Sequence, residues 1–262
     1  MSPAERNTPA PAGEPTSVIR RIASLMAAFG PEDTYLGVNE LARRTDLPKA
    51  TVSRLVRDMT EHGFLERDGV RVGLGLRLFE WGEHASRRRS VREVALPFMA
   101  DLREATGQTI HLAILDGSEV VYIEILRNHN APRLPSRVGG RLPAHATGVG
   151  KALLAAAPET VAGRGIEAGL VPVGPRTITS EQQLRRQLRR IAAAGIAYDH
   201  EESGHGIVCA AAAIRDSHGT PIAAVSACGW AGKVNLRRVG PAVHTTALSI
   251  TRRLASIPGR LA

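Results

Sequence analysis

Four apolar side chains between Lys49 and His62 recur at the spacing of one helix face, which strongly limits how this part of the chain can fold. They form an i, i+3, i+4, i+7 stripe: Val52, Leu55, Val56 and Met59. The opposite face carries small and basic side chains: Ala50, Ser53, Arg54 and Arg57. A shorter amphipathic segment, 39–45, comes before this helix, and Asp46-Leu47-Pro48 separates the two as a tight turn. The pattern predicts a helix-turn-helix with a small, basic outer surface on its later helix.

A hairpin signal follows this helix directly. Polar and apolar residues alternate over 64–72 around Asp68-Gly69, a dipeptide typical of tight β-turns. A three-helix bundle with a solvated basic face would explain the helical stripes equally well. It would not explain the turn, the hairpin and the Arg/Ser face together. We therefore expect a winged helix that binds DNA, with its later helix in the major groove.

The predicted DNA contacts lie on that helix and on the hairpin. Small side chains let a helix approach the groove, and arginine reaches a guanine edge or a phosphate. Residues at the helix start suit contacts with backbone phosphates. The full set is Lys49, Ala50, Thr51, Ser53, Arg54, Arg57, Arg67 and Arg71. The formal net charge of +9 is compatible with an acidic partner such as double-stranded DNA.

The sequence pattern divides the chain into four stretches. Residues 1–15 are rich in Pro, Ala, Glu and Thr, which predicts a disordered leader. Residues 16–73 contain a first amphipathic helix and the winged helix-turn-helix. Residues 74–90 are expected to form an apolar linker helix that ends in an arginine run and makes a dimer contact. Residues 91–262 form the second domain.

The second domain mixes helices and strands. We expect helices over 91–106, 181–194 (capped by Ser180) and 239–256, and strands over 109–115, 119–126, 196–199, 207–214 and 222–227. Hairpins with helices grouped between them predict an antiparallel sheet of α+β type. The whole chain is therefore expected to be an α+β protein of two domains.

The run HATGVGKALLA, residues 145–155, has the pattern of an anion-binding helix start. Amides at such a glycine-rich start can cradle a small anion. A nucleotide P-loop is excluded, because His145 stands where that motif needs glycine and Ala152 where it needs Ser or Thr. Lys151 has two possible roles: it neutralises the anion, or it has a structural role such as pairing with an acid.

Three separated segments, in the same order, resemble the IclR family of bacterial transcriptional regulators. They are residues 138–152 (VGGRLPAHATGVGKA), Glu201-Glu202 followed by 206–211 (GIVCAA), and Ala224-Val225-Ser226. The resemblance covers nearly the whole chain from about residue 16. It implies a winged-helix domain, a dimerising linker helix and a GAF-like effector-binding domain, assembled as a homodimer or a dimer of dimers.

The resemblance also implies a ligand-responsive regulator, more often a repressor. A small carboxylate effector would change the affinity for operator DNA. Its pocket would be formed by the amides of Gly148 and Val149, by Asp199, Cys209, Ser226 and Cys228, and by an apolar wall of Leu134 and Ile207. Cys228 stands where some relatives that bind small keto acids carry serine, and Ala213 replaces a common proline. Because a thiol is larger and a poorer donor than a hydroxyl, aromatic or other catabolic acids are at least as well suited as glyoxylate or pyruvate.

Purely structural roles would also fit some of these residues. Asp199 would serve equally as a turn residue that caps the following loop, and Cys209 as inert core. The two cysteines, Cys209 and Cys228, have no metal-ligand spacing and are expected to be free buried thiols.

No catalytic or metal template fits the sequence. His200 and His205 are five residues apart, whereas a zinc-binding helix needs four, and Ser226 lacks the flanking glycines of a nucleophile elbow. No apolar run reaches membrane-helix length. We expect a cytoplasmic protein that is not an enzyme, with no metal, cofactor or membrane partner. The rival interpretation is a GAF-like sensor or enzyme whose N-terminal domain binds protein.

Overall fold

The structure, a computed structural model, describes residues 17–83, 86–128 and 136–257. The leader expected over 1–15 lies outside the described residues. Contacts divide the chain after Ala85 into two compact units. Each unit is described by itself.

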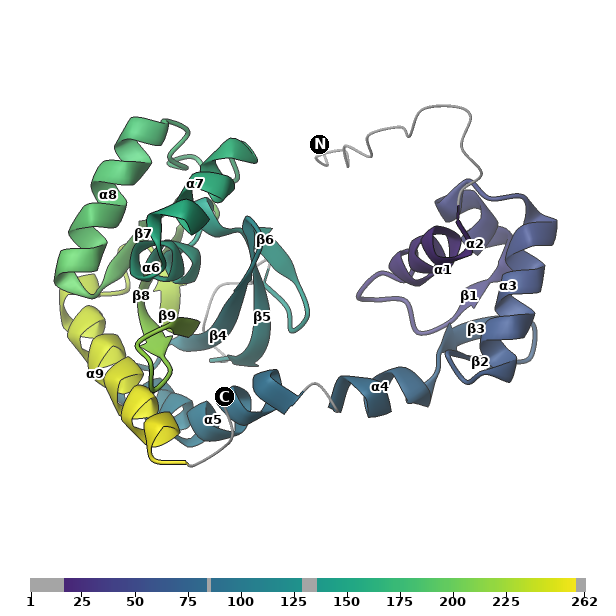
Figure 1. The fold of residues 1–262 in the computed structure, drawn as a ribbon, viewed down its shortest axis with the longest axis horizontal. Coiled ribbons are helices and arrows are strands. Elements are labelled where there is room, and N and C mark those ends of the chain that lie inside the picture. Colours follow the sequence, from purple (N-terminus) through teal and green to yellow (C-terminus); the bar gives the residue numbers. More distant parts are fainter. Residues whose placement is uncertain (1–16, 84–85, 129–135, 258–262) are drawn as a thin grey trace. The chain divides into compact units, whose positions relative to one another are not determined.

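The N-terminal unit contains the predicted helix-turn-helix (Figure 1). Its elements are α1 (Val18–Ala27), β1 (Leu36–Gly37), α2 (Val38–Thr45), α3 (Lys49–Glu61), β2 (Leu65–Asp68), β3 (Arg71–Leu74) and α4 (Leu76–Glu83). Ser17 caps α1 by accepting from the amide of Arg20. Asp46, with φ of 53°, ends α2 in the left-handed conformation and begins the three-residue turn. The predicted stripe of α3 is buried in one core with residues of α1 and α2.

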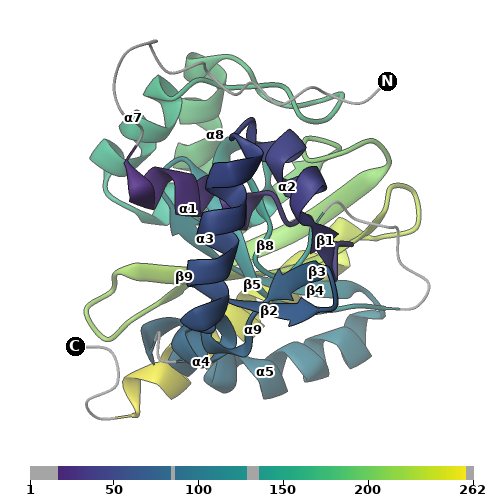
Figure 2. The same cartoon turned by 90° about the vertical axis from the view of Figure 1, so that its right-hand side faces the viewer.

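The hairpin joins a small antiparallel sheet with the strand order β1-β3-β2. Strand β2 packs beside α3, which Figure 2 shows side-on. The turn differs by one residue from the expected one: Asp68 pairs with Arg71, so Gly69 and Val70 are its central residues. Only Gly69 has positive φ, at 58°. A hairpin turn with positive φ at its first central position needs glycine there, which explains the shift.

The helix boundary expected at residue 90 is not observed, and residues 84–85 of the expected linker helix lie outside the described residues. Helix α4 ends at Glu83, and α5 (Ser86–Thr106) contains the arginine run together with the helix expected from Val91. Arginine has a high helix propensity, and no glycine or proline occurs between Ser86 and Pro97 to end the helix. Sequence reasoning treated a change of polarity as a helix boundary, although polarity alone does not end a helix.

The C-terminal unit is built on one antiparallel sheet with the strand order β6-β5-β4-β9-β8-β7. Its strands are β4 (Thr109–Asp116), β5 (Glu119–Leu126), β6 (Arg141–Pro143), β7 (Ala197–His200), β8 (Ile207–Arg215) and β9 (Pro221–Trp230). Its further helices are η1 (Ala144–Ala146), α6 (Gly148–Ala156), α7 (Glu159–Glu167), α8 (Glu181–Ala194) and α9 (Leu236–Ala255). The α+β fold of two domains is therefore confirmed. Helix α8 has the expected bounds, but the side chain of Ser180 makes no capping hydrogen bond.

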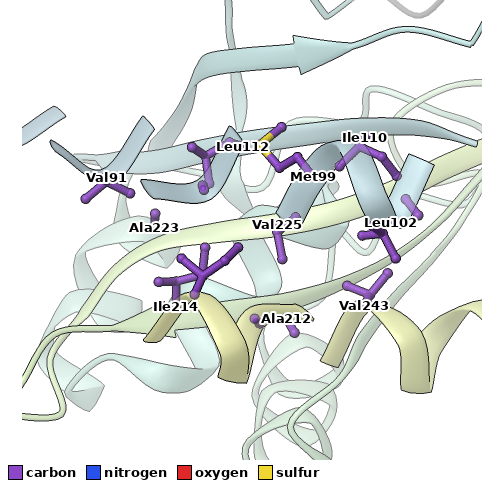
Figure 3. Close-up of a cluster of buried hydrophobic side chains, with 14 of the residues drawn as sticks. Val91, Met99, Leu102, Ile110, Leu112, Ala212, Ile214, Ala223, Val225 and Val243 are labelled. Carbon is purple, nitrogen blue, oxygen red and sulfur yellow. The ribbon is translucent and has the colours of Figure 1, made fainter. Parts of the chain in front are cut away.

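Helices cover both faces of this sheet. Helices α5 and α9 cover one face, where alternate strand residues such as Leu112, Ile214 and Val225 form an apolar cluster with Met99 and Val243 (Figure 3). Helices α6 and α8 pack over the other face in a second cluster. Because side chains alternate along a strand, alternate residues of β4, β5, β7, β8 and β9 lie on the face that α6 contacts. That face contains the predicted effector residues.

Candidate functional site

The predicted DNA contacts of α3 form one exposed face. Lys49, Ala50, Ser53, Arg54 and Arg57 are exposed, and Thr51 is half-buried. Arg57 lies 3.4 Å from Asp58, a long surface ion pair that contributes little to stability. Within the part of the chain that the structure describes, Lys49 and Arg54 have no ion-pair partner. These cations are therefore available to an anionic ligand.

The two predicted wing arginines are also exposed but are not brought together. Arg67 lies opposite Val72 and Arg71 lies opposite Asp68 in the β2–β3 register. Adjacent cross-strand pairs point to opposite faces of a hairpin. Arg67 and Arg71 therefore project from opposite faces, and one surface cannot contact both in the same way.

In the C-terminal unit, the strand register brings polar side chains into rows under α6. Asp199 of β7 pairs with Cys209 of β8, which pairs with Cys228 of β9, which pairs with Thr109 of β4. The neighbouring row on the same face contains Ser226 and its partner His111. All six side chains are buried. Buried polar residues on an otherwise apolar sheet face mark this as the candidate site.

The start of α6 faces this group. Thr147 accepts a hydrogen bond from the amide of Gly150 at 3.0 Å and so caps the helix. The preceding amides, Gly148 and Val149, have no recorded acceptor among the described residues, although both residues are buried. A Cβ atom added at Gly148 would lie 3.2 Å from Sγ of Cys209 and 3.6 Å from Cβ of Asp199. The structure therefore brings Gly148, Cys209 and Asp199 together.

The thiols and Ser226 continue the group. Sγ of Cys228 lies 2.6 Å from Sγ of Cys209 and 3.6 Å from Oγ of Ser226. Both cysteines are free. Ile207, also buried, stands two residues before Cys209 on β8 and so shares its face. Leu134, the other residue of the expected apolar wall, lies outside the described residues.

Asp199 has the structural role that the sequence left open, as a residue that caps the following loop. Its carboxylate accepts from the amide of Glu202 at 2.7 Å and from the hydroxyl of Ser203 at 2.6 Å, so it caps the loop after β7. Burial raises the pKa of Asp199 to about 6, although these hydrogen bonds favour the charged form. The carboxyl group therefore becomes neutral in mildly acidic solution.

Lys151 does not offer its charge to a ligand. It is buried, and its Nζ donates to Oε2 of Glu202 at 2.6 Å and to the carbonyl of Tyr198 at 2.7 Å. Of the two roles left open by the sequence, the structure supports pairing with an acid. The anion-binding features of the motif are therefore the helix amides and not the lysine.

Sequence reasoning missed two aromatic residues and one serine. Nε2 of His111 lies 2.8 Å from Oγ of Ser136, and the ring centroids of His111 and Tyr122 are 5.2 Å apart. Burial raises the pKa of Tyr122 well above its usual value, so its hydroxyl stays protonated. One sequence feature could have identified His111: Thr109 and His111 are polar residues at alternate positions of an otherwise apolar strand.

The described residues show neither a metal-ligand cluster nor a membrane-spanning helix. They contain no group of three or more His, Cys, Asp or Glu that could hold a metal ion. Among the helices described, none is long and apolar enough to span a membrane.

Comparison with known proteins identifies both units. A family model described as "Bacterial transcriptional regulator IclR C-terminal" matches residues 83–252, and one described as "IclR helix-turn-helix domain" matches residues 18–69. The transcriptional repressor IclR of Escherichia coli is 30% identical, with 88% of this chain and 86% of that protein covered. The transcriptional repressor AllR of Klebsiella pneumoniae is 33% identical over 84% of each chain.

Solved structures agree with these matches. An IclR homologue from Microbacterium hydrocarbonoxydans, crystallised with 4-hydroxybenzoate, has a TM-score of 0.86 and 32% identity, with 92% of this chain and all of that chain covered. IclR of Thermotoga maritima has a TM-score of 0.75 and 29% identity, with 90% and 98% covered. The relatives are named as regulators and not as enzymes. With a helix-turn-helix and an IclR C-terminal unit in one chain, this DNA-binding transcriptional regulator belongs to the IclR family.

Proposed function

We propose that this regulator binds a small organic acid at the start of α6 and that the bound acid changes its affinity for operator DNA. The observation that carries the proposal is the pair of buried amides at Gly148 and Val149, for which no acceptor is recorded among the described residues. A buried helix start without acceptors is unusual, and the positive end of the helix dipole favours an anion there. A carboxylate group would accept from both amides.

The surrounding residues favour an aromatic acid over a two-carbon or three-carbon keto acid. His111 and Tyr122 place two rings beside the polar rows, and Cys228 is larger and less polar than serine. A similar protein, 32% identical, holds 4-hydroxybenzoate. We propose that the carboxylate of the acid lies at the α6 amides and that its ring packs toward Tyr122.

On the DNA side, we propose that α3 enters the major groove, with Arg54 and Arg57 nearest the DNA. A protein that reads two half-sites must present two such helices. Apolar side chains of α4 are exposed: Leu76 by 66%, Phe79 by 65% and Trp81 by 54%. We propose that they pack against a second copy in a homodimer, which can pair again as a dimer of dimers.

Coupling between the two functions would follow from a change in the separation of the paired reading helices. Acid bound under α6 changes the packing of this helix on β8 and β9, which it contacts directly. A small change in the separation of the two reading helices alters affinity, because the spacing of the two half-sites on DNA is fixed. Several relatives are named repressors, so we propose that the DNA-bound form represses transcription.

Thermal unfolding with added acids tests the ligand proposal. A ligand that binds only the folded protein raises the melting temperature by mass action. We expect 4-hydroxybenzoate to raise it in wild-type protein, and to do so much less in Ser226→Ala and Gly148→Val. Gly163→Ala is the matched glycine control, since a Cβ atom there meets nothing within 4 Å. The site is wrong if neither aromatic nor keto acids bind, or if both site variants respond like wild type.

A further inference from the structure

The only two cysteines of the chain face each other across two strands. Cys209 and Cys228 are direct partners in the antiparallel β8–β9 register, and their Sγ atoms are 2.6 Å apart. Directly opposite residues in such strands have Cα atoms about 4.5 or 5.5 Å apart, and a disulfide spans about 4.4 to 6.8 Å. The backbone therefore already has the separation that a disulfide needs.

We infer that Cys209 and Cys228 are a two-thiol oxidation site, which forms a reversible intramolecular disulfide on reaction with a small hydroperoxide. The Sγ atoms need to approach only to the S–S bond length of about 2.05 Å, a movement that side-chain rotation can supply. The strands do not need to separate. Because the chain has no third cysteine, no competing disulfide can form within one copy.

The reaction balances in two steps. The thiolate of Cys228 attacks one oxygen of the hydroperoxide, the O–O bond breaks, and a sulfenic acid forms. The departing alkoxide (or hydroxide) takes up the proton that the thiol lost on ionisation and leaves as an alcohol (or water). Sγ of Cys209 then attacks the sulfenic sulfur and forms the S–S bond, and water leaves with the thiol proton. Overall, two thiols lose two hydrogens and two electrons, and the hydroperoxide is reduced.

The surroundings assign the attacking sulfur. Burial opposes ionisation of Cys228, but its hydrogen bond with Cys209 and the nearby His111 outweigh burial and lower its pKa. The hydrogen bond with Cys228 raises the pKa of Cys209, and burial and Asp199 raise it further. The geometry points the same way, because Asp199 is the strand partner of Cys209 and its negative charge opposes a thiolate there, whereas Oγ of Ser226 lies 3.6 Å from Sγ of Cys228. Since the thiolate is the reactive form, we assign Cys228 as the nucleophile and Cys209 as the resolving thiol. Both retain slight exposure, 6% for Cys228 and 4% for Cys209.

Peptide mapping of the full chain tests the inference. Reduced protein is treated with hydrogen peroxide, unfolded, alkylated and digested with trypsin without reduction. Cleavage after Arg190, Arg215 and Lys233 separates the cysteines into peptides 191–215 and 216–233. We expect these two peptides to be linked to each other, the intact mass to fall by two hydrogens, and dithiothreitol to reverse both changes. Unlinked, fully alkylated cysteines or a linkage between two chains would overturn the inference.

Single variants separate the two roles. In Cys209→Ser, oxidation should stop at the sulfenic acid of Cys228, which dimedone labels. In Cys228→Ser, dimedone should label Cys209 at least ten-fold more slowly. Equal labelling of the two variants would contradict the assignment of Cys228 as nucleophile, while the linked peptides of the wild type would still decide whether the disulfide forms.

Oxidation would also remove both thiol hydrogens from the candidate site, including that of Cys209 beside Gly148, and the consequence for ligand binding rests on the proposed function. We expect the oxidised protein to show a smaller melting-temperature increase with 4-hydroxybenzoate than the reduced protein. Equal melting-temperature increases in the oxidised and reduced proteins would show that oxidation does not affect ligand binding. A reduced protein that does not respond to any acid would instead contradict the proposed function, and the linked peptides would remain as evidence for the oxidation site.

Discussion

Lys151 and Glu202 form an ion pair in the interior of the C-terminal unit, with side chains that are 0% and 4% exposed. The pair joins α6 to the loop after β7, and Lys151 also donates to the carbonyl of Tyr198. The same loop is capped by Asp199, which lies beside Gly148. The ion pair therefore holds the helix start and the acidic residue of the candidate site in one arrangement.

Removal of the lysine should destabilise the protein strongly. Lys151→Met leaves Glu202 buried without its partner, which typically costs about 3 to 5 kcal/mol in the free energy of unfolding. Lys151→Met combined with Glu202→Gln should recover much of that loss, because no unpaired charge remains. Urea unfolding of the two variants measures the difference. A single variant that loses less than about 1 kcal/mol, well below that range, would contradict the importance of the pair.

Two glycines near one another in sequence should respond in opposite ways to alanine. At Gly150, a Cβ atom would lie 2.1 Å from the carbonyl oxygen of Ala144, so the backbone must shift. We expect Gly150→Ala to cost at least about 2 kcal/mol. At Gly163, inside α7, a Cβ atom meets nothing within 4 Å, and alanine should stabilise the helix by about 0.5 to 1 kcal/mol. Urea unfolding checks both, and equal effects would contradict the close contact of α6 with η1.

The sequence was most informative where the pattern is local. Helix α3 follows from its apolar stripe and α8 from its amphipathic period, and the long strands follow from runs of apolar residues between turns. Helix α7 was missed because Gly163 and Gly165 weaken its helical signal, and β6 because it has three residues. Neither element has a strong pattern of its own, so contacts with the rest of the unit determine its structure.

The candidate site was predictable only in part for the same reason. Gly148 and Val149 belong to one contiguous motif and could be read from it. His111 and Tyr122 join them only because β4 lies between β5 and β9 in the sheet. Strand order is a property of tertiary packing, and no local pattern near His111 reports it. Conversely, the role of Lys151 depends on Glu202, 51 residues away.

The carboxyl group of Asp199 should make stability depend on pH. Its pKa is raised by burial from 3.8 to about 6, so between these values the folded protein binds more protons than the unfolded one. This contribution to stability is present below the unfolded pKa and is lost as pH rises through about 6. Between pH 5 and pH 7, wild type should therefore lose about 1 kcal/mol more stability than Asp199→Asn.

Urea unfolding of both proteins at the two pH values measures this difference. Comparison with the isosteric variant removes the contributions of other groups, such as His145, whose pKa is lowered by burial. Parallel pH dependence in wild type and variant would show that Asp199 is not protonated in this range. Binding of an organic acid should also strengthen below pH 6 in wild type only, because the neutral carboxyl group no longer repels it.

The proposed dimer contact on α4 can be tested with one charge. Phe79, 65% exposed, should lie in the contact, so Phe79→Asp should shift the protein toward the monomer in sedimentation equilibrium. Val171, which is 51% exposed in the other unit, is the matched control, and Val171→Asp should leave the oligomeric state unchanged. A wild-type monomer, or a Phe79→Asp variant that associates as wild type does, would contradict the contact.

The central claim, that α3 reads DNA, is tested most directly by selection of random-sequence DNA with the purified full-length protein. Wild type should enrich an inverted repeat with half-sites at a fixed spacing, and its affinity should fall with salt. The Arg54→Ala, Arg57→Ala double variant should lose this enrichment. An Arg186→Ala, Arg190→Ala variant carries the same charge change on α8 and should retain it. Enrichment of the same repeat, with unchanged affinity, by a folded Arg54→Ala, Arg57→Ala protein would contradict the account.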